Sequence, residues 1–554
     1  MLTVLLQVRS HAKALGCNMV VGYQENTVIC EDVLIMSSSG TAAVCNLDFM
    51  SELESGGGGG GGRSSFSKES VLNCGVCHIP YSEASVPFPI KLMRCGLCGR
   101  GKVADILIST LEPPPELEVL GEGGLIQARV LRLKKDLKGE HDAREVSDAL
   151  PFLEYEIHRQ LVNKLKVKGM NAIFGLTVSL SLADRMLVGL ASGTAVCLPA
   201  LPSPALPRVL DTGLRANRDQ QHAGKLQERL REKVEANKEY FGLKRDTEAV
   251  MDDGEVWEEQ QGLAELDLSA GNKDTCVLEV DDIEDTDIVD SLLDNLPPKG
   301  VQVLSCQTPV GVDSSRGITA CQAFAQVWRG RLEKPTSREF STASQQLVSA
   351  VCFKLRRLQP CLLASLSWQV SLDDDEVQLN LSGVAIAFDD QQEVVQKKED
   401  GEVKEGELVF RLEEVQSTTD AAGSSVCPKL KLGRNPPFFF AAPTALPHIG
   451  VNLTPTPYVP GARIDHHLGN LNLFYIRETS GLREAGGLNS FVQRFLCEVL
   501  GILRAQVAAL GGNAVTSYTL ATCVLTHSPH KNQAQCLVNV GGDVVSAVYV
   551  HRQA

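Results

Sequence analysis

The residues best suited to chemistry are four cysteines arranged as two C-x2-C pairs. Cys74 and Cys77 form the first pair, Cys95 and Cys98 form the second, and seventeen residues separate the pairs. Two cysteines three positions apart lie on one tight turn, so both thiolates can reach the same tetrahedral ion at about 2.3 Å. Four thiolates would leave no coordination position for water. The spacing therefore predicts a structural site for Zn2+ that supports the folding of a short segment.

Other interpretations of these cysteines remain open. They could form a redox pair or two unrelated pairs, and His78, which follows Cys77, could replace one of them as a ligand. The other cysteines fall in helix and strand patterns, where core packing is expected. The acidic stretch EVDDIEDTD (279–287) lacks the spacing of an EF-hand. No residue is predicted to be catalytic.

Composition limits the classes of function. The chain has 554 residues, enough for three or four domains, and a net charge of −15 from 53 basic and 68 acidic residues. That charge disfavours binding of nucleic acid or anionic lipid by the chain as a whole. Uninterrupted apolar runs stay below the length of about 18 residues that spans a membrane, and the opening MLTVLLQV has neither a basic flank nor a cleavage site. We therefore expect a cytoplasmic protein.

Three segments resemble one another: LGCNMVVGY (15–23), KGMNAIFGL (168–176) and LGGNAVTSY (510–518). In each, a glycine precedes an asparagine by two positions and apolar residues follow. Glycine adopts the left-handed conformation that ends a helix at little cost. The asparagine is expected to bond local backbone in the turn that leads into a strand. The predicted turn residues are Gly16, Asn18, Gly169, Asn171, Gly511 and Asn513.

The segments around these turns also repeat. The segments 147–169 and 488–512 carry apolar residues at helical spacing, and each follows a strand pattern. A second strand such as SSGTAAV (38–44) or ASGTAVCL (191–198) comes after the turn. The sequence therefore predicts an α+β fold of repeated strand–helix–strand–strand units, with an inserted four-cysteine zinc module and disordered linkers.

The predicted domains follow from this repeat. The first copy has no residues left for its leading strand, so we expect that strand to lie upstream. A degenerate copy without the Gly-x-Asn turn is expected between the two later copies. The predicted boundaries are a truncated unit at 1–50, a Gly/Ser-rich linker at 51–70, the zinc module at 71–110, a unit at 117–200, a Pro-rich, helical and acidic linker at 201–300, the degenerate unit at 301–390, a disordered linker at 391–445 and a C-terminal unit at 446–554.

Long motifs of the chain resemble the C2 domain-containing protein 5 family. They include CGVCHIPYSEASVPFP, LPFLEYEIHRQLVNKLKVKGMNAIFGL, YVPGARIDHHLGNLNLFYIRETSGLREAGG and HKNQAQCLVNVGGD. The repeated unit is similar to the small bacterial YbjQ-type domain. That resemblance implies units that stack within one chain or between chains.

The resemblance implies a non-enzymatic scaffold or adaptor in vesicle trafficking. The family's C2 domain binds phospholipid in a calcium-dependent way, and the family promotes insulin-stimulated glucose transporter translocation and vesicle fusion with the plasma membrane. The implied partners are trafficking proteins and vesicle membranes, and the implied locations are the plasma membrane, the cell cortex and cytoplasmic vesicles. No stretch of this sequence reads as a C2 β-sandwich, so Ca2+ would act only through a C2 domain absent here, and direct lipid or nucleic-acid binding is not expected. The alternative is a metal-dependent or redox enzyme that uses the C-x2-C pairs.

Overall fold

The computed structural model of the chain describes most of the predicted units. It describes residues 2–30, 33–45, 73–82, 91–114, 117–135, 139–211, 219–243, 277–280, 286–311, 318–332, 335–373, 376–388, 450–459, 461–528 and 530–549. The predicted linkers at 51–70 and 391–445, and most of the acidic stretch after residue 243, lie outside these residues.

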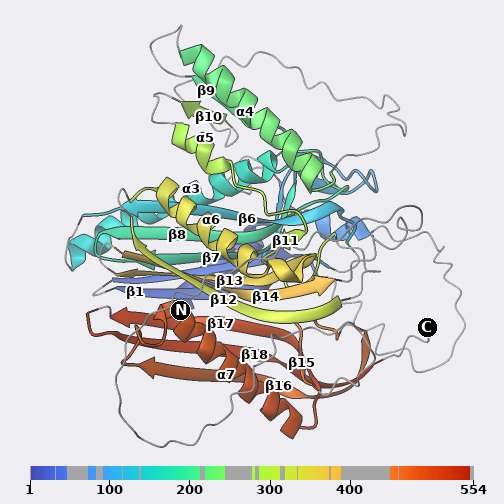
Figure 1. The fold of residues 1–554 in the computed structure, drawn as a ribbon. Helices are drawn as coiled ribbons and strands as arrows, with labels where there is room; N and C mark the ends of the chain where they lie inside the picture. The colour runs from blue at the N-terminus through green and yellow to red at the C-terminus, as the bar shows by residue number, and fades with distance from the viewer. Residues whose placement is uncertain are drawn as a thin grey trace, which may run out of the picture. The chain divides into compact units, whose positions relative to one another are not determined.

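Three units share one topology, which confirms the predicted repeat (Figure 1). Unit 2 (residues 107–197) contains β5 (Leu107–Ile108), β6 (Leu120–Leu133), α3 (Glu140–Val167), β7 (Ala172–Leu182) and β8 (Met186–Cys197). Its sheet has the order β5-β7-β8-β6, with β5 parallel to β7 and the other pairs antiparallel. The short strand β5 and the long strand β6 therefore lie at the two edges of the sheet, and the hairpin of β7 and β8 occupies the middle.

Units 3 and 4 repeat this order. Unit 3 (301–388) has the sheet order β11-β13-β14-β12, and unit 4 (452–549) has β15-β17-β18-β16. The degenerate copy is thus a complete unit. The elements are β11 (Val301–Val303), β12 (Ile318–Arg331), α6 (Ser337–Lys354), β13 (Cys361–Asp373), β14 (Glu376–Phe388), β15 (Asn452–Leu453), β16 (Ala462–Thr479), α7 (Gly487–Ala509), β17 (Ala514–Ser528) and β18 (Gln533–Tyr549).

Unit 1 (2–45) has fewer elements. Its described residues form α1 (Leu2–Ala14) and the antiparallel hairpin β1 (Met19–Cys30) and β2 (Val33–Ala43). This hairpin corresponds to the central hairpin of the other units. The described part of unit 1 therefore supplies a helix and two strands, as the sequence predicted.

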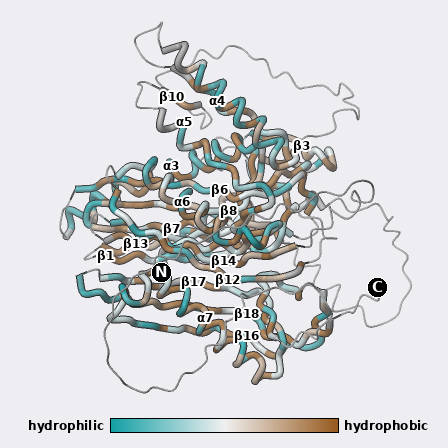
Figure 2. Tube along the Cα trace, in the orientation of Figure 1, coloured by the Kyte–Doolittle hydropathy of each residue, from teal (hydrophilic) through white to brown (hydrophobic). Residues whose placement is uncertain are grey.

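The helices of units 2 to 4 carry both polar and apolar residues (Figure 2). Each packs against its own sheet, and α6 and α7 also contact β6 of unit 2 and β12 of unit 3, respectively. In α3, Leu153, Ile157, Leu161 and Leu165 are buried, as the helical spacing predicted. In α7 the buried stripe includes Phe491, Phe495, Val499, Leu503 and Val507. Helix packing against the sheet thus provides the main core of each unit.

A β-bulge recurs at one position of the first hairpin strand in all four units. The register shifts lie between Val21 and Gln24, Phe174 and Thr177, Ala364 and Ser367, and Thr516 and Thr519. The left-handed residues in these bulges are Gly22, Gly175, Ser365 and Ser517. A left-handed serine is costly compared with glycine, so the bulge is a property of the fold that persists where the residue type does not favour it.

The repeated glycines and asparagines have a clear structural role. Gly16, Gly169 and Gly511 have φ values of 70°, 75° and 80°, which is the left-handed conformation that ends the preceding helix. The asparagine side chains do not follow the expected local pattern. Asn171 Nδ2 donates to Leu198 O (3.0 Å), and its Oδ1 accepts from Leu198 N (2.7 Å), 27 residues away.

The same pair of hydrogen bonds forms in two other units. Asn18 bridges the backbone of Cys45 with two bonds of 2.8 Å, and Asn513 bridges Ala547 with two bonds of 2.7 Å. We call this arrangement the asparagine clasp. It fastens the start of one hairpin strand to the end of the other, so the local hydrogen bonds expected from the sequence are replaced by long-range ones.

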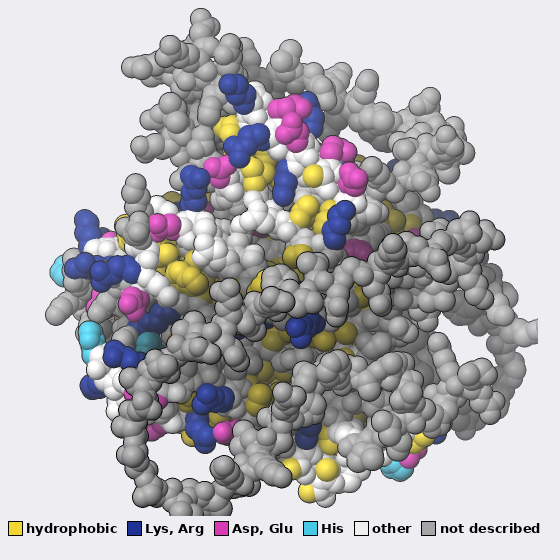
Figure 3. Space-filling view, in the orientation of Figure 1, with side chains coloured by type: hydrophobic (Ala, Val, Ile, Leu, Met, Phe, Trp, Pro, Cys, Tyr) yellow, Lys and Arg dark blue, Asp and Glu magenta, His cyan; other side chains and the backbone are white. Residues whose placement is uncertain are grey.

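The segment between units 2 and 3 forms a small layer of its own. It contains β9 (Arg208–Asp211), α4 (Asp219–Tyr240), β10 (Val277–Val280) and α5 (Thr286–Leu292). Leu226, Leu230 and Val234 of α4 are buried in one cluster with residues of α5 and β10, so this helix packs on its own domain. On the face shown in Figure 3, acidic and basic side chains are interspersed. Among the described residues, no helix is long and apolar enough to cross a membrane.

Candidate metal centre

The first cysteine pair lies on a single tight turn. A 3-10 helix, η1 (Asn73–Cys77), carries Cys74 and Cys77. His78 N donates to Gly75 O (3.1 Å) and closes the turn, and Ile79 N donates to Lys102 O (2.9 Å). The second bond fastens this turn to the strand that follows the other cysteine pair.

The second pair lies at the tip of a hairpin. Strands β3 (Leu92–Arg94) and β4 (Lys102–Ala104) are antiparallel, and Cys95 N donates to Gly101 O (2.8 Å) to continue the ladder. Gly101 N also donates to Cys98 Sγ at 3.2 Å. A backbone N–H aimed at sulfur favours the thiolate, which is the form that binds a metal.

The two turns bring three cysteines and one histidine together. The ligand atoms of Cys74, His78, Cys95 and Cys98 all lie within 4.8 Å of one another, and Cys98 Sγ is 3.4 Å from His78 Nε2. In a tetrahedral zinc site the S–N separation is about 3.5 Å, given the usual Zn–S and Zn–N distances. The donor set therefore fits a zinc ion with three sulfur ligands and one nitrogen ligand.

Cys77 lies outside that group, although it belongs to the predicted set of four cysteines. It is 1% exposed, and burial together with the nearby Cys95 raises its pKa. Sequence reasoning treated His78 only as a substitute ligand. Its position directly after Cys77, within the same turn, is the signal that would have placed it in the site.

The thiols of the site differ in their acidity. Burial, with hydrogen bonds to Cys98 and Cys95, raises the pKa of Cys74 to about 12, and burial raises that of Cys77 to about 11. The backbone N–H groups of Gly101 and Arg100 lower the pKa of Cys98 to about 6. The low pKa of Cys98 favours its thiolate at neutral pH. Cys74 keeps its proton until a metal cation binds to its sulfur and displaces that proton.

The metal module (residues 73–104) is fastened to unit 2 at its clasp. Gly96 N donates to Ala200 O (2.9 Å), and Leu107 N, just after the module, donates to Asn171 O (3.1 Å). A side chain at residue 96 would place its Cβ 2.7 Å from Pro199 O, so glycine is needed for this close approach. Cys74, Cys77 and Cys95 belong to the same buried cluster as Phe174 and Leu198 of unit 2. The module therefore leads directly into the edge strand of the sheet of unit 2.

Four ligands fill the tetrahedral shell of zinc and leave no position for a reacting water. When bound, the ion would supply cross-linking of two turns and charge compensation for buried thiolates. The ligands that would hold it are Cys74, His78, Cys95 and Cys98. Cys77 is not a member of this group. This arrangement fits a closed, structural metal site.

Comparisons with known proteins give three family matches. Residues 3–48 and 100–204 match "C2 domain-containing protein 5, YbjQ-like domain", residues 298–387 match "C2 domain-containing protein 5, fifth YbjQ-like domain", and residues 453–547 match "C2CD5, C-terminal domain". These ranges overlap units 1 to 4. The four cysteines of the metal module fall in the gap between residues 48 and 100.

Curated relatives match along nearly the whole chain. C2 domain-containing protein 5 of Homo sapiens is 38% identical over 579 aligned residues, which cover 97% of this chain and 57% of the relative. The proteins of that name from Mus musculus and Xenopus tropicalis are also 38% identical, with 97% and 58% coverage. The chain thus spans a little over half the length of the curated relatives it matches.

Proposed function

Because the chain belongs to the C2 domain-containing protein 5 family, we propose that it is a non-enzymatic scaffold for vesicle-trafficking partners. The observation that carries this proposal is one contact that recurs at two junctions, between units 1 and 2 and between units 2 and 3. Thr41 Oγ1 of unit 1 accepts from Thr110 N (2.8 Å), just after the edge strand of unit 2. Thr194 Oγ1 of unit 2 accepts from Ser305 N (3.0 Å), just after the edge strand of unit 3.

These two junctions join units 1, 2 and 3 in one array. Thr41 and Thr194 each follow the glycine of the Gly-Thr-Ala motif, so the same sequence motif makes both junctions. Stacked repeats present broad surfaces to partner proteins, and the metal module stiffens the approach to unit 2. These features suit an adaptor better than a catalyst.

The role in trafficking is inferred from the family. We propose that the longer family protein promotes insulin-stimulated glucose transporter translocation and vesicle fusion with the plasma membrane, with Ca2+ and phospholipid bound by a C2 domain. The sheets formed by the described residues have two or four strands, unlike a C2 sandwich. We therefore propose a cytoplasmic scaffold that reaches the plasma membrane, the cell cortex and vesicles through its partners.

Two measurements test this proposal. Liposome flotation of this chain with calcium should show no lipid binding, whereas affinity capture with the tagged chain should recover vesicle-trafficking proteins. The capture is repeated with a chain in which Thr41 and Thr194 are both replaced by Val. This variant should no longer recover partners that bind across two units. Calcium-dependent flotation, or capture of no trafficking protein, would contradict the proposal.

Metal analysis tests the structural role of the module. We expect about one zinc per chain, lost in the Cys74→Ser, Cys95→Ser double variant and retained when the half-buried Cys321 is replaced by Ser. Removal of zinc should expose the amides of residues 92–108 to hydrogen exchange. Unchanged exchange after chelation would show that the ion does not support this segment.

The low pKa of Cys98 favours one second candidate, a redox or metal-dependent enzyme that uses the cysteine pairs. Such an enzyme needs a reactive thiol in the metal-loaded protein. Alkylation separates the two candidates: a scaffold with a closed zinc site should react slowly at all four cysteines until zinc is chelated. Rapid modification of Cys98 in the zinc-loaded protein would favour the enzyme.

A further inference from the structure

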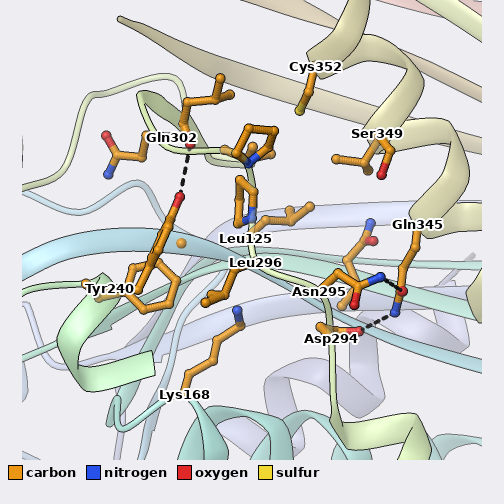
Figure 4. Close-up of a pocket in the computed structure, with 18 of the residues that line it drawn as sticks. Leu125, Lys168, Tyr240, Asp294, Asn295, Leu296, Gln302, Gln345, Ser349 and Cys352 are labelled. Atoms are coloured by element: carbon orange, nitrogen blue, oxygen red, sulfur yellow. Dashed lines mark hydrogen bonds between the residues drawn. The ribbon is translucent and has the colours of Figure 1, made fainter. Parts of the chain in front are cut away.

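A cavity of about 80 Å³ lies between unit 2, the segment before unit 3 and helix α6 (Figure 4). Arg129 and Lys168 of unit 2 line one side, Asp294 and Leu296 line another, and Gln345 of α6 completes it. Cavities for drug-sized ligands usually measure about 300–1,000 Å³. This one has room for a group of a few heavy atoms.

The charges around the cavity do not balance. Lys164 Nζ donates to both carboxylate oxygens of Asp294 at 3.0 Å, and Arg129 contacts the same carboxylate at 3.3 Å. Arg129, Lys164 and Lys168 are 4%, 1% and 8% exposed. Three buried cations therefore lie around one carboxylate, that of Asp294, whose side chain is 15% exposed. Glu122, which also lines the cavity, is exposed and belongs to its rim.

Of the three cations, Lys168 has the fewest partners for its positive charge. Among the described residues, its ammonium group makes no ion pair or hydrogen bond, and its one contact of this kind is with the Phe241 ring, 5.2 Å from the centroid. Figure 4 shows Lys168 reaching into the space beside Leu296 and Asp294. Arg129 Nε is also buried without a hydrogen-bond partner. A buried donor without an acceptor is costly, so this site has unused capacity for an anion.

We propose that this cavity binds a small oxyanion, a free phosphate group, held by Lys168 and Arg129. Guanidinium and ammonium donors form charge-assisted bonds to phosphate oxygens that are stronger than neutral ones. The cavity volume suits inorganic phosphate or the phosphate end of a small ester. Such an anion would balance the excess of positive charge.

The burial of the two lysines also shifts their pKa values. Burial lowers the pKa of Lys168, and burial lowers that of Lys164 to about 8, although Asp294 acts in the opposite sense on both. An anion in the cavity would oppose this shift and favour the charged form of Lys168. Because the lining comes from unit 2 and from α6 of unit 3, the bound anion would also link the two units.

Thermal unfolding of the full chain in inorganic phosphate provides the test, with chloride used to hold ionic strength constant. The melting temperature should rise with phosphate concentration, because a ligand that binds only the folded state stabilises it. Lys168→Met removes the ammonium group and keeps the apolar stem, and should weaken phosphate binding about tenfold or more, the loss expected for one charge-assisted bond. Lys354→Met, at an exposed position of α6, is the matched control and should bind as the wild type does.

A second variant keeps the test valid if Lys168→Met fails to fold. Ser349 is an exposed residue that lines the cavity, so Ser349→Phe should obstruct it and abolish the phosphate response without removing a charge. Glycerol phosphate should compete with inorganic phosphate. The proposal is overturned if phosphate stabilises no better than chloride, if both obstructing and charge variants respond like the wild type, or if only vesicles that contain phosphatidic acid stabilise the chain.

Discussion

At the scale of single residues, Asp294 is the carboxylate on which the buried charges of unit 2 depend. Burial would raise its pKa, but the cations of Lys164, Arg129 and Lys168 outweigh that effect and hold the pKa well below its usual range. Replacing one member of a buried ion pair leaves an uncompensated charge, which costs about 3–5 kcal/mol. We therefore predict that Asp294→Asn lowers the free energy of unfolding by that amount, as measured by urea denaturation at pH 7.

Asp290 provides the matched control for this prediction. It pairs with Arg229 and Arg338 near the surface, and such pairs are worth about 0–1 kcal/mol. A depressed carboxylate pKa stabilises the fold above the unfolded value of about 3.9, and this contribution is lost as pH falls towards the folded pKa. The gap between the wild type and Asp294→Asn should thus narrow below about pH 4. Equal losses in the free energy of unfolding for Asp294→Asn and Asp290→Asn would show that the buried cations do not depend on Asp294.

At the scale of the elements, the asparagine clasp replaces one rung of the hairpin ladder. Asn171 is fully buried and satisfies both backbone groups of Leu198. Asn171→Ala leaves Leu198 N without an acceptor, while Leu198 O keeps the bond from Leu201 N (3.2 Å). We therefore predict a loss of about 1–3 kcal/mol in the free energy of unfolding. Asn18 makes the same two bonds at an exposed site, where water can replace them. Asn18→Ala should cost less than about 1 kcal/mol, and a similar cost at both sites would contradict this account.

The bulge offers a second comparison between units. Gly175 has a φ of 58°, and a Cβ there would lie 2.8 Å from Cys306 Sγ. Ser365 holds the corresponding position of unit 3 with a φ of 53°. We predict that Gly175→Ala destabilises the chain by about 1–2 kcal/mol, whereas Ser365→Gly stays within about 1 kcal/mol of the wild type on the stabilising side. Thermal unfolding of both variants is the measurement, and destabilisation by Ser365→Gly would show that its side chain has a role of its own.

The sequence predicted the elements that carry a long periodic pattern. The helices and long strands of three units show in their apolar spacing, and the cysteine pairs show in their separation. The edge strands β5, β11 and β15 have only two or three residues each, too few for any periodicity. The partners of Asn171 and Asn513 lie 27 and 34 residues away, and local sequence contains no signal of such pairing. The left-handed Ser365 was equally hidden, since serine does not mark a bulge.

At the scale of the whole molecule, the units depend on one another through the junctions between them. The Thr194 hydroxyl is fully buried and accepts from both Ser305 N and Cys306 N. In unit 3 the loop that contains these donors follows directly after the edge strand β11. A change at Thr194 in unit 2 should therefore be felt in the sheet of unit 3.

We predict that Thr194→Val, which keeps the shape and removes the hydroxyl, destabilises the chain by about 2 kcal/mol, because the N–H groups of the buried Cys306 and the half-buried Ser305 lose their acceptor. Hydrogen exchange should rise at residues 301–308 of unit 3 while the helix α3 of unit 2 stays protected. Thr342→Val, at an exposed position of α6, is the control. It should change the free energy of unfolding by no more than about 0.5 kcal/mol and leave hydrogen exchange at residues 301–308 as in the wild type. If faster exchange were confined to unit 2, the junction would not transmit stability between units, and the array would behave as separate domains joined in one chain.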